Sequence, residues 1–330
     1  MRRVKWGVLG TAYIFERDMA EGMKQADNCA LYAIAGRSME KAEAFKEKYG
    51  FQMAYGSYEE LLSDPEVEAV YIPLPNTMHY EWTIRALKAG KHVLCEKPLA
   101  PAEEQAREMF ETAREHHVFL MEAFAYQHSP YLAEIKKELE NGTIGEIRYM
   151  EAALITSDYV EGNIRMRRET LGGSTYDLGV YCNSLILRML GREPEKIQAV
   201  SSFSGEGVDM YTAVLMEYEN GMRASFDCGM VLATEKNSAL DRFQIHGTKG
   251  SIEGVKFGFN VPGELSYMVR KFEGGEELKT VSVPQNYRLE VEQLGRCITE
   301  GEQPFVTEMF SLTNARMIDR ILKCIGYSEV

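Results

Sequence analysis

Paired cysteines and metal-type histidine patterns are missing from this chain, and their absence excludes two classes of protein. The 330 residues include six cysteines and six histidines. The cysteines are scattered, with no CxxC spacing, and a chain of this length buries enough core to fold without disulfides. The histidines form no HExxH or HxH pattern. We therefore expect neither a disulfide framework nor a structural or catalytic metal.

A basic surplus and long apolar runs are also missing. The formal net charge is −13, which argues against nucleic acid or an anionic membrane as a partner, because both require a basic surface. No apolar run is long enough to span a bilayer, and residues 1–10 begin a strand rather than a signal peptide. We expect a cytoplasmic protein with no nucleic-acid or membrane partner.

Short apolar runs alternate with amphipathic stretches in the first third of the chain. This alternation predicts a doubly wound α/β sheet, with strands at 4–9, 30–35, 67–72, 92–95 and 118–121. The remainder has longer strand patterns from about 144 onward, the Asn220-Gly221 hairpin signal and two closing helices near 287–300 and 308–324. We predict domains at 1–123 and 124–330, the second an α+β domain on a large, mainly antiparallel open sheet.

The turn after the first strand matches a dinucleotide-binding turn only in part. Gly10 fits the first glycine of GxGxxG, whereas Ala12 and Phe15 replace the other two. The strand before and the helix after add support, because a pyrophosphate binds backbone N–H groups at a helix N-terminus. On local residues alone, an ordinary βα turn is an alternative. The cofactor contacts that we assign to this turn are Gly10, Thr11, Ala12, Tyr13 and Ile14.

The end of the second strand indicates which dinucleotide is bound. An acid usually holds the ribose hydroxyls of NAD at this point, but this chain has Arg37 and Ser38. A guanidinium and a hydroxyl suit a 2′-phosphate. We therefore predict that NADP(H) is preferred, with NAD(H) possible. A surface arginine near a helix start is the alternative.

Two later loops contribute further candidate residues. The segment after strand 67–72 supplies Pro73, Leu74, Asn76 and His79, with Asn76 also suited to capping a helix. The second segment is Cys95-Glu96-Lys97-Pro98, where Pro98 stops the strand that precedes it. Lys97 thus follows a parallel strand at the sheet edge where ligands bind. We assign Glu96 and Lys97 to the cofactor site.

Motifs along nearly the whole chain resemble the Gfo/Idh/MocA family, named after glucose–fructose oxidoreductase and inositol dehydrogenase. They are Gly7-x-x-Gly10-Thr11-Ala12, Pro73-x-x-Asn76-x-x-His79, Cys95-Glu96-Lys97-Pro98, Glu122-Ala123-Phe124 and Gly172-Gly173-Ser174-Thr175-Tyr176-Asp177-Leu178-Gly179-Val180-Tyr181. The resemblance implies a dinucleotide-binding Rossmann domain over 1–123. It also implies a substrate-binding domain over 124–330 that often forms homodimers or homotetramers through its sheet.

Tyr181 departs from the commonest family pattern, Asp-x-Gly-x-His. A tyrosine here resembles the branch that contains glucose–fructose oxidoreductase, dimeric dihydrodiol dehydrogenases and NADP-linked xylose dehydrogenases. The resemblance therefore implies an NADP(H)-dependent oxidoreductase that transfers hydride to or from a sugar, polyol or cyclic diol.

The chemistry of hydride transfer suggests roles for three residues. A group must take or supply the hydroxyl proton, and an unperturbed tyrosine titrates near ~10. An ammonium at ~4 Å contributes roughly 4 kcal/mol, enough to lower that pKa by about three units at most. We hypothesise that Tyr181 is the acid/base and that Lys97 lowers its pKa. Asp177, four residues before Tyr181 on the same helix face, would hold a substrate hydroxyl and orient Lys97.

Several alternatives stay open. Tyr181 could be a core tyrosine, Asp177 a charge at a helix N-terminus and Lys97 a solvated lysine. The arginines of 163–168 could clamp a phosphate or an acidic substrate, or could be ion-paired in a loop. Glu122, Tyr126 and Tyr159 are candidates to line a sugar pocket. A non-catalytic NAD(P)-binding sensor, or a redox-neutral glycoside-processing enzyme that retains its nicotinamide, is the alternative function.

Overall fold

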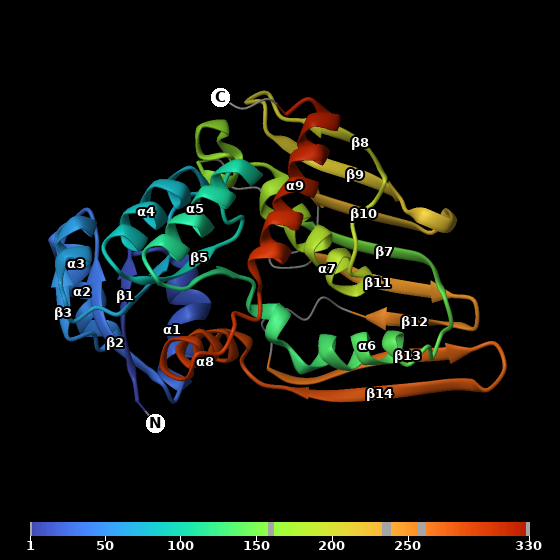
Figure 1. Cartoon of the computed structure of the whole chain (residues 1–330). Coiled ribbons are helices and arrows are strands. Elements are labelled where there is room, and N and C mark those ends of the chain that lie inside the picture. Colours follow the sequence, from blue (N-terminus) through green and yellow to red (C-terminus); the bar gives the residue numbers. More distant parts are fainter. Residues whose placement is uncertain (1, 158–161, 233–238, 256–261, 328–330) are drawn as a thin grey trace. The chain divides into compact units, whose positions relative to one another are not determined.

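The computed structural model describes residues 2–157, 162–232, 239–255 and 262–327, which divide into two compact units (Figure 1). The first unit contains the described residues up to Ser129 together with Pro284–Leu312, and the second contains nearly all the others. The predicted boundary near 123 assigned everything after it to one domain. In the structure the segment 284–312 belongs to the first unit, because its helix, residues 286–300, packs against helix and strand residues of that unit.

Six parallel strands form the sheet of the first unit, in the order β3-β2-β1-β4-β5-β6. They are β1 (Val4–Leu9), β2 (Cys29–Ala35), β3 (Met53–Tyr55), β4 (Ala69–Ile72), β5 (His92–Glu96) and β6 (Leu120–Ala123). Every residue of β4 and β6 is buried, as expected for a parallel sheet covered on both faces. The predicted α/β fold is confirmed. The three-residue strand β3 was not predicted, because so short a run carries no periodicity.

Helices cover both faces of this sheet. The apolar sides of α3 (Tyr58–Ser63), α4 (Asn76–Lys88) and α5 (Glu103–Glu115) form one core with the strands. On the other face, α1 (Ala20–Gln25) and α8 (Asn286–Glu300) pack together against β1 and β2 (Figure 1). The helix α2 (Met39–Tyr49) packs beside β2 and β3. A π-helical turn, Phe15–Met19, leads into α1.

Two glycines allow α8 to approach the first unit closely. A Cβ atom on Gly22 of α1 would lie 2.6 Å from the Tyr287 Cβ atom. A Cβ atom on Gly295 would lie 2.3 Å from Asn28 Nδ2, which donates a 2.8 Å hydrogen bond to the Glu292 carbonyl oxygen. Any side chain at these two positions would push the helix away. This contact attaches α8 to the dinucleotide-binding unit.

Eight strands form the sheet of the second unit, in the order β14-β13-β12-β11-β7-β10-β9-β8. They are β7 (Ile147–Thr156), β8 (Lys196–Phe203), β9 (Asp209–Glu217), β10 (Arg223–Met230), β11 (Ala239–Gly247), β12 (Gly250–Val255), β13 (Gly263–Lys271) and β14 (Gly275–Val283). All neighbours are antiparallel except β7 and β10. The predicted mainly antiparallel sheet is confirmed. Between β9 and β10, Asn220 and Gly221 both have positive φ, as the hairpin signal predicts.

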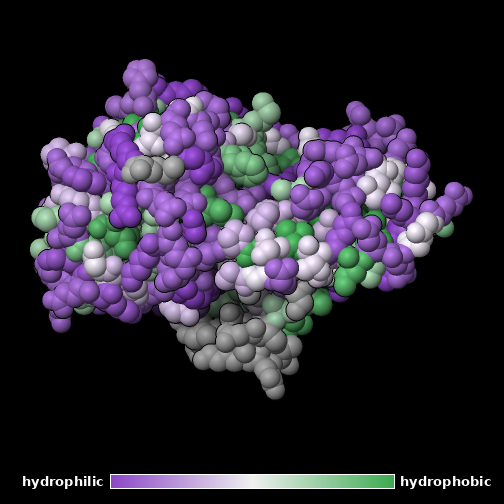
Figure 2. Space-filling model, turned by 90° about the horizontal axis from the view of Figure 1, so that it is seen from below, coloured by the Kyte–Doolittle hydropathy of each residue, from purple (hydrophilic) through white to green (hydrophobic). Residues whose placement is uncertain are grey.

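Helices pack on one face of this sheet, and the other, which we call the open face, exposes several apolar side chains. The helices α6 (Pro130–Glu140) and α7 (Val180–Leu190) pack on the covered face, and α9 (Glu308–Ile325) continues into this unit from Thr313. The strand register places Val200, Leu215 and Leu240 on the open face, where they are 71%, 37% and 37% exposed. The face of the molecule drawn in Figure 2 is mainly hydrophilic, with small hydrophobic groups among the coloured residues.

The state of the cysteines and the character of the helices relate to two expectations from the sequence. All six cysteines are free thiols. Within the described ranges, no helix combines the length and the apolar character that a membrane span needs.

The close contact between α1 and α8 generates the first prediction. Gly22→Ala should destabilise the protein by about 1–3 kcal/mol, because the added methyl forces the helices apart, even though alanine favours a helix by about 1 kcal/mol over glycine. Urea unfolding followed by circular dichroism measures this loss. Glu21→Ala, at the exposed neighbouring position, is the matched control and should change stability little. Equal stability of the two variants would contradict the packing role of Gly22.

Candidate functional site

The turn after β1 has the backbone that a dinucleotide requires. Gly10 has φ of +115°, and a Cβ atom there would lie 3.0 Å from the Leu74 Cδ2 atom. Its N–H donates a 2.8 Å hydrogen bond to the Ala35 carbonyl oxygen, which holds the turn beside β2. Phe15, at the third glycine position of the motif, is fully buried and packs against Phe45. The bulky residue therefore faces the helix packing and leaves the turn itself open.

These residues fit a bound dinucleotide. The helix that follows the turn leaves the N–H groups of its first turn without intrahelical partners, which suits a pyrophosphate. Gly10 lets the backbone approach such a group closely, and Tyr13 stands 70% exposed at the helix start. Arg37, exposed at the end of β2, and Ser38 lie where the ribose of the adenosine would be recognised. The Ser38 hydroxyl accepts a 3.4 Å hydrogen bond from the Lys41 N–H and keeps its own proton to donate.

His79 joins the two loops that follow β4 and β5. Its Nδ1 atom lies 2.8 Å from the Pro98 carbonyl oxygen, and its Nε2 atom lies 2.8 Å from the Leu74 carbonyl oxygen. A neutral imidazole donates to only one of these oxygens, whereas an imidazolium donates to both. Burial lowers the pKa of His79, which opposes the second proton. Both ring nitrogens therefore face backbone carbonyl oxygens of the protein, and the imidazole packs between the two loops.

The Lys97 loop is fixed from the next strand. Lys97 is half-buried, and its peptide bond to Pro98 is cis. The buried Glu122 of β6 accepts a 2.9 Å hydrogen bond from the Leu99 N–H through its Oε1 atom. Burial raises the pKa of Glu122 to about 7. The carboxyl group therefore holds the backbone two residues beyond Lys97 and does not reach the surface.

A second buried carboxyl group precedes Lys97. Glu96 accepts a 2.5 Å hydrogen bond from the Tyr71 hydroxyl, on the sheet face that α8 covers. Burial raises the pKa of Glu96 and, together with the charge of Glu96, raises the pKa of Glu290 on α8 well above its usual range. Neither carboxyl oxygen of Glu290 has a hydrogen-bond partner among the described residues. Both carboxyl groups are buried in this part of the first unit, and burial disfavours the charged form of each.

Asp177 and Tyr181 occupy the accessible positions of a buried segment in the second unit. The helix starts with a π-helical turn, Thr175–Gly179, and continues as α7. From 171 to 187, every residue is buried except Asp177 and Tyr181, which are half-buried. The predicted helix and the shared face of the two side chains are thus consistent with this pattern. Single π-helical turns occur frequently at functional sites.

The arginine loop is ion-paired and hydrogen-bonded. Arg165 Nε donates a 2.6 Å hydrogen bond to Asp177 Oδ2, within an ion pair whose aspartate side chain is 18% exposed. Arg167 lies 3.5 Å from Glu169. Arg168 donates to the Gly207 carbonyl oxygen and its guanidinium stacks on the Tyr327 ring at 4.3 Å. Of the two alternatives for this loop, the structure supports the paired one, and the Arg165 contact with Asp177 was not foreseen.

Two of the three residues suggested for a sugar pocket are buried. Glu122 and Tyr126 are 2% and 1% exposed, in the protein interior. Tyr159 lies outside the described residues. In the part of the chain that the structure describes, no group of three or more histidine, cysteine, aspartate or glutamate side chains is arranged to hold a metal.

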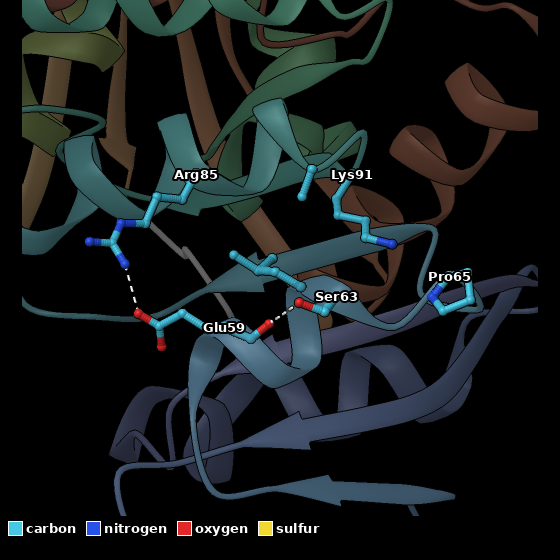
Figure 3. Close-up of a pocket in the computed structure, with 7 residues that line it drawn as sticks. Glu59, Ser63, Pro65, Arg85 and Lys91 are labelled. Atoms are coloured by element: carbon cyan, nitrogen blue, oxygen red, sulfur yellow. Dashed lines mark hydrogen bonds and ion pairs between the residues drawn. The ribbon is translucent and has the colours of Figure 1, made fainter.

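A pocket of about 500 Å³ lies at the amino ends of strands of the first sheet, opposite the predicted cofactor end (Figure 3). Lys91, directly before β5, donates hydrogen bonds to the carbonyl oxygens of Asp64 and Val67, at 2.6 and 2.9 Å. Arg85 and Glu59 form an ion pair across the rim. In open α/β sheets ligands bind at the carboxyl ends of the strands, whereas this pocket lies at their amino ends. It is not the predicted cofactor site.

The buried carboxyl of Glu122 generates a prediction on pH. Its folded pKa of about 7 exceeds the ordinary 4.5, so the folded protein binds the extra proton and loses stability as pH rises between these values. Glu122→Gln keeps the acceptor for Leu99 and removes this titration. The free energy of unfolding of the variant should therefore rise relative to that of the parent by about 1–3 kcal/mol from pH 4.5 to 7. Urea unfolding at several pH values measures the difference.

Glu115→Gln is the control for this experiment, because the Glu115 side chain is exposed at the end of α5. Its difference from the parent should not vary over the same pH range. A flat difference for Glu122→Gln as well would show that the Glu122 carboxyl ionises normally in the folded protein.

Comparison with known protein families gives two matches that together span most of the chain. Residues 4–124 match the oxidoreductase family with an NAD-binding Rossmann fold, GFO_IDH_MocA. Residues 132–253 match the GFO/IDH/MocA C-terminal domain.

Characterised and uncharacterised relatives align over almost their whole length. An uncharacterised oxidoreductase of Rhizobium meliloti is 32% identical, with 97% of this chain and 96% of that protein covered. A trans-1,2-dihydrobenzene-1,2-diol dehydrogenase of Xenopus laevis is 30% identical, with 98% of each covered. A D-xylose 1-dehydrogenase (NADP(+)) of Haloferax volcanii is 32% identical, with 96% of this chain and 95% of that protein covered.

Solved structures share the same architecture. A 3-ketoreductase of Actinomadura kijaniata in complex with NADP and TDP-benzene superimposes with a TM-score of 0.90 at 28% identity, over 98% of each chain. Structures of its variants replace a tyrosine by phenylalanine and a lysine by alanine, at positions 84 residues apart. The family matches over both parts of the chain, with relatives above 30% identity along its whole length, show that this protein belongs to the Gfo/Idh/MocA family of oxidoreductases.

Proposed function

We propose that this protein is an NADP(H)-dependent oxidoreductase that transfers hydride to or from a sugar, polyol or cyclic diol. The observation that carries the proposal is the exposure of Asp177 and Tyr181 alone within the buried segment 171–187. A polar pair kept accessible in such a segment suits contact with a substrate better than a role in the core. The names of the relatives support the substrate class, since they act on a dihydrodiol and on xylose.

The cofactor preference rests on Arg37 and Ser38. Arg37 is exposed at the end of β2, and the Ser38 hydroxyl retains a proton to donate. Both groups favour a 2′-phosphate, and neither of them is an acid that would repel it. The xylose dehydrogenase and the ketoreductase among the relatives carry NADP in their names or complexes, which supports the same preference here.

Tyr181 would carry the proton in this reaction. When bound, the nicotinamide supplies or accepts the hydride. Tyr181 takes the proton from the substrate hydroxyl in one direction and returns it in the other. Lys97 makes this possible at neutral pH by lowering the tyrosine pKa, by at most about three units for an ammonium at ~4 Å. Lys97 and Tyr181 are 84 residues apart, the separation of the replaced lysine and tyrosine in the ketoreductase variants, which supports their pairing.

Asp177 would orient the substrate hydroxyl. Its Oδ2 atom accepts a hydrogen bond from Arg165, which holds the carboxylate in place, and a carboxylate can accept several hydrogen bonds, one of them from a substrate hydroxyl. Because the guanidinium balances the carboxylate, the helix presents a nearly neutral polar surface beside Tyr181. Such a surface favours an uncharged polyhydroxy substrate over an acidic one.

The open face of the second sheet is the surface that we propose for a homodimer or homotetramer. Val200 and Leu215, on the paired strands β8 and β9, and Leu240, on β11, expose apolar area on that face. Burial of such area in a symmetric contact is the ordinary use of an uncovered sheet face.

Replacement of the acid/base tests the function. Tyr181→Phe should lower kcat about 100- to 10,000-fold, the usual contribution of a positioned proton-transfer group, with the affinity for NADPH unchanged. Steady-state assays with aldoses, polyols and dihydrodiols, followed at the nicotinamide absorbance, measure the loss. Tyr149→Phe, on β7 in the second unit, is the control and should retain activity. Full turnover by Tyr181→Phe would refute the assignment, and no turnover by the parent across the panel would favour a sensor.

Replacement of Arg37 tests the cofactor preference. Arg37→Ala should weaken NADPH binding about 10- to 100-fold, because a charge-assisted hydrogen bond contributes about 1.5–3 kcal/mol, and should leave NADH binding nearly unchanged. Fluorescence titration with each dinucleotide measures both affinities. Arg107→Ala, at an exposed arginine of α5, should change neither. An equal loss for NADPH and NADH would contradict recognition of the 2′-phosphate.

A further inference from the structure

The helix that carries Asp177 and Tyr181, residues 175–190, is called the catalytic helix below. Several buried contacts hold the segment that leads into it. The Gly173 N–H donates a 2.8 Å hydrogen bond to the Arg165 carbonyl oxygen, and the Tyr327 hydroxyl donates one of 2.8 Å to the Gly172 carbonyl oxygen. Two residues later the π-helical turn starts at Thr175. The position of this start determines where Asp177 and Tyr181 lie, because the helix between them is continuous and buried.

A buried carboxylate from another strand binds this helix start. Asp209, the first residue of β9, has no exposed surface. Its Oδ2 atom accepts hydrogen bonds of 2.7 Å from the Ser174 hydroxyl, the Thr175 N–H and the Thr175 hydroxyl. It also accepts a 3.0 Å bond from the Thr212 hydroxyl. Asp209 thus caps the helix start at Thr175, although the two residues are 34 positions apart in sequence.

The fit around the other carboxylate oxygen is equally close. A Cβ atom on Gly173 would lie 2.0 Å from Asp209 Oδ1, and Gly173 has φ of +111°. Oδ1 itself has no hydrogen-bond partner among the described residues. The second glycine of the Gly172-Gly173 motif is therefore required by Asp209 and not by the helix alone.

Stability does not explain this arrangement well. Burial of a carboxylate is unfavourable, and burial raises the pKa of Asp209 while its hydrogen bonds oppose the rise. No ion pair to Asp209 occurs within the described ranges to compensate the cost. The helix N-terminus favours an anion, but by about 0.3–2 kcal/mol. A buried polar group of this kind more often specifies one arrangement than it adds stability.

We propose that Asp209 is a positioning residue, which fixes the first turn of the catalytic helix through Ser174 and Thr175 and so holds Asp177 and Tyr181 in the orientation that turnover needs. This inference rests on the proposed function, in which Tyr181 exchanges the proton. Asp209 touches neither substrate nor cofactor in this role.

Asp209→Asn is the main test, because it keeps the size of the side chain but replaces the carboxylate with a neutral amide, whose oxygen is a weaker acceptor for the donors of Ser174 and Thr175. We expect kcat to fall about 10- to 100-fold, the effect of a misplacement of about 1 Å. The affinity for NADPH should stay unchanged, since the cofactor residues lie in the first unit. Ser201→Ala is the matched control. Ser201 contacts Thr212 but not the helix, and its variant should keep the parental kcat.

Changes at Thr175 distinguish positioning from general destabilisation. Thr175→Val removes one of the bonds to Asp209 and should lower kcat, whereas Thr175→Ser keeps the hydroxyl and should restore it. The double variant Asp209→Asn, Thr175→Val should be no slower than the slower single variant, because both act through one contact. The comparison of Thr175→Val with Thr175→Ser holds even if Asp209→Asn folds poorly, which circular dichroism would reveal.

Each outcome decides the question. Parental kcat in folded Asp209→Asn, or independent additive losses in the double variant, would overturn the inference. A loss of NADPH affinity equal to the loss of kcat would also overturn it, since it would indicate global damage. Tyr181→Phe is measured in parallel. If that variant turns over fully, the proposed function fails, whereas an inactive Tyr181→Phe beside a fully active Asp209→Asn refutes only the role of Asp209.

Discussion

The ring of His79 lies between the loops that follow β4 and β5, with one nitrogen 2.8 Å from the Leu74 carbonyl oxygen and the other 2.8 Å from the Pro98 carbonyl oxygen. Buried backbone carbonyls need hydrogen-bond partners, and a neutral imidazole supplies one N–H for these two oxygens. The packing of this ring between the two carbonyl groups sets the distance between the loops. The Leu74 side chain in turn lies against the position that a Cβ atom of Gly10 would occupy. The pyrophosphate turn and the Lys97 loop are thus connected through a single buried ring.

The sequence predicts the parts of this structure that depend on local pattern. Strand and helix periodicity, the Asn220-Gly221 turn and the glycine at position 10 each follow from physics that acts within a few residues. The return of α8 to the first unit does not. It depends on the absence of side chains at Gly22 and Gly295, which lie against Tyr287 and Asn28 respectively. These residues come together only after the chain has passed through the second sheet. Nothing in the local sequence distinguishes these glycines from others.

The candidate residues divide in the same way. Lys97, Asp177 and Tyr181 could be selected because they stand in family motifs with chemical reasons for their types. The positions of Glu290 and Asp209, and the role of Glu122 as a buried acceptor, could not be predicted, since glutamate and aspartate side chains usually face solvent. Their burial is visible only in three dimensions. Arg165 was noted within a basic loop. Its pairing with Asp177, 12 residues later in the sequence, became visible only in the folded structure.

The two units use one device to hold the residues that the proposed reaction needs. Glu122 accepts the N–H of Leu99, two residues after Lys97, and Asp209 accepts the N–H of Thr175, two residues before Asp177. In each case a buried carboxyl group on a strand accepts a hydrogen bond from the backbone close to a residue of the proposed site. Because the backbone is held at these points, the positions of Lys97, Asp177 and Tyr181 within their own units are constrained. This positioning gives a reason for buried acids, which are unfavourable to bury, so near both predicted catalytic segments.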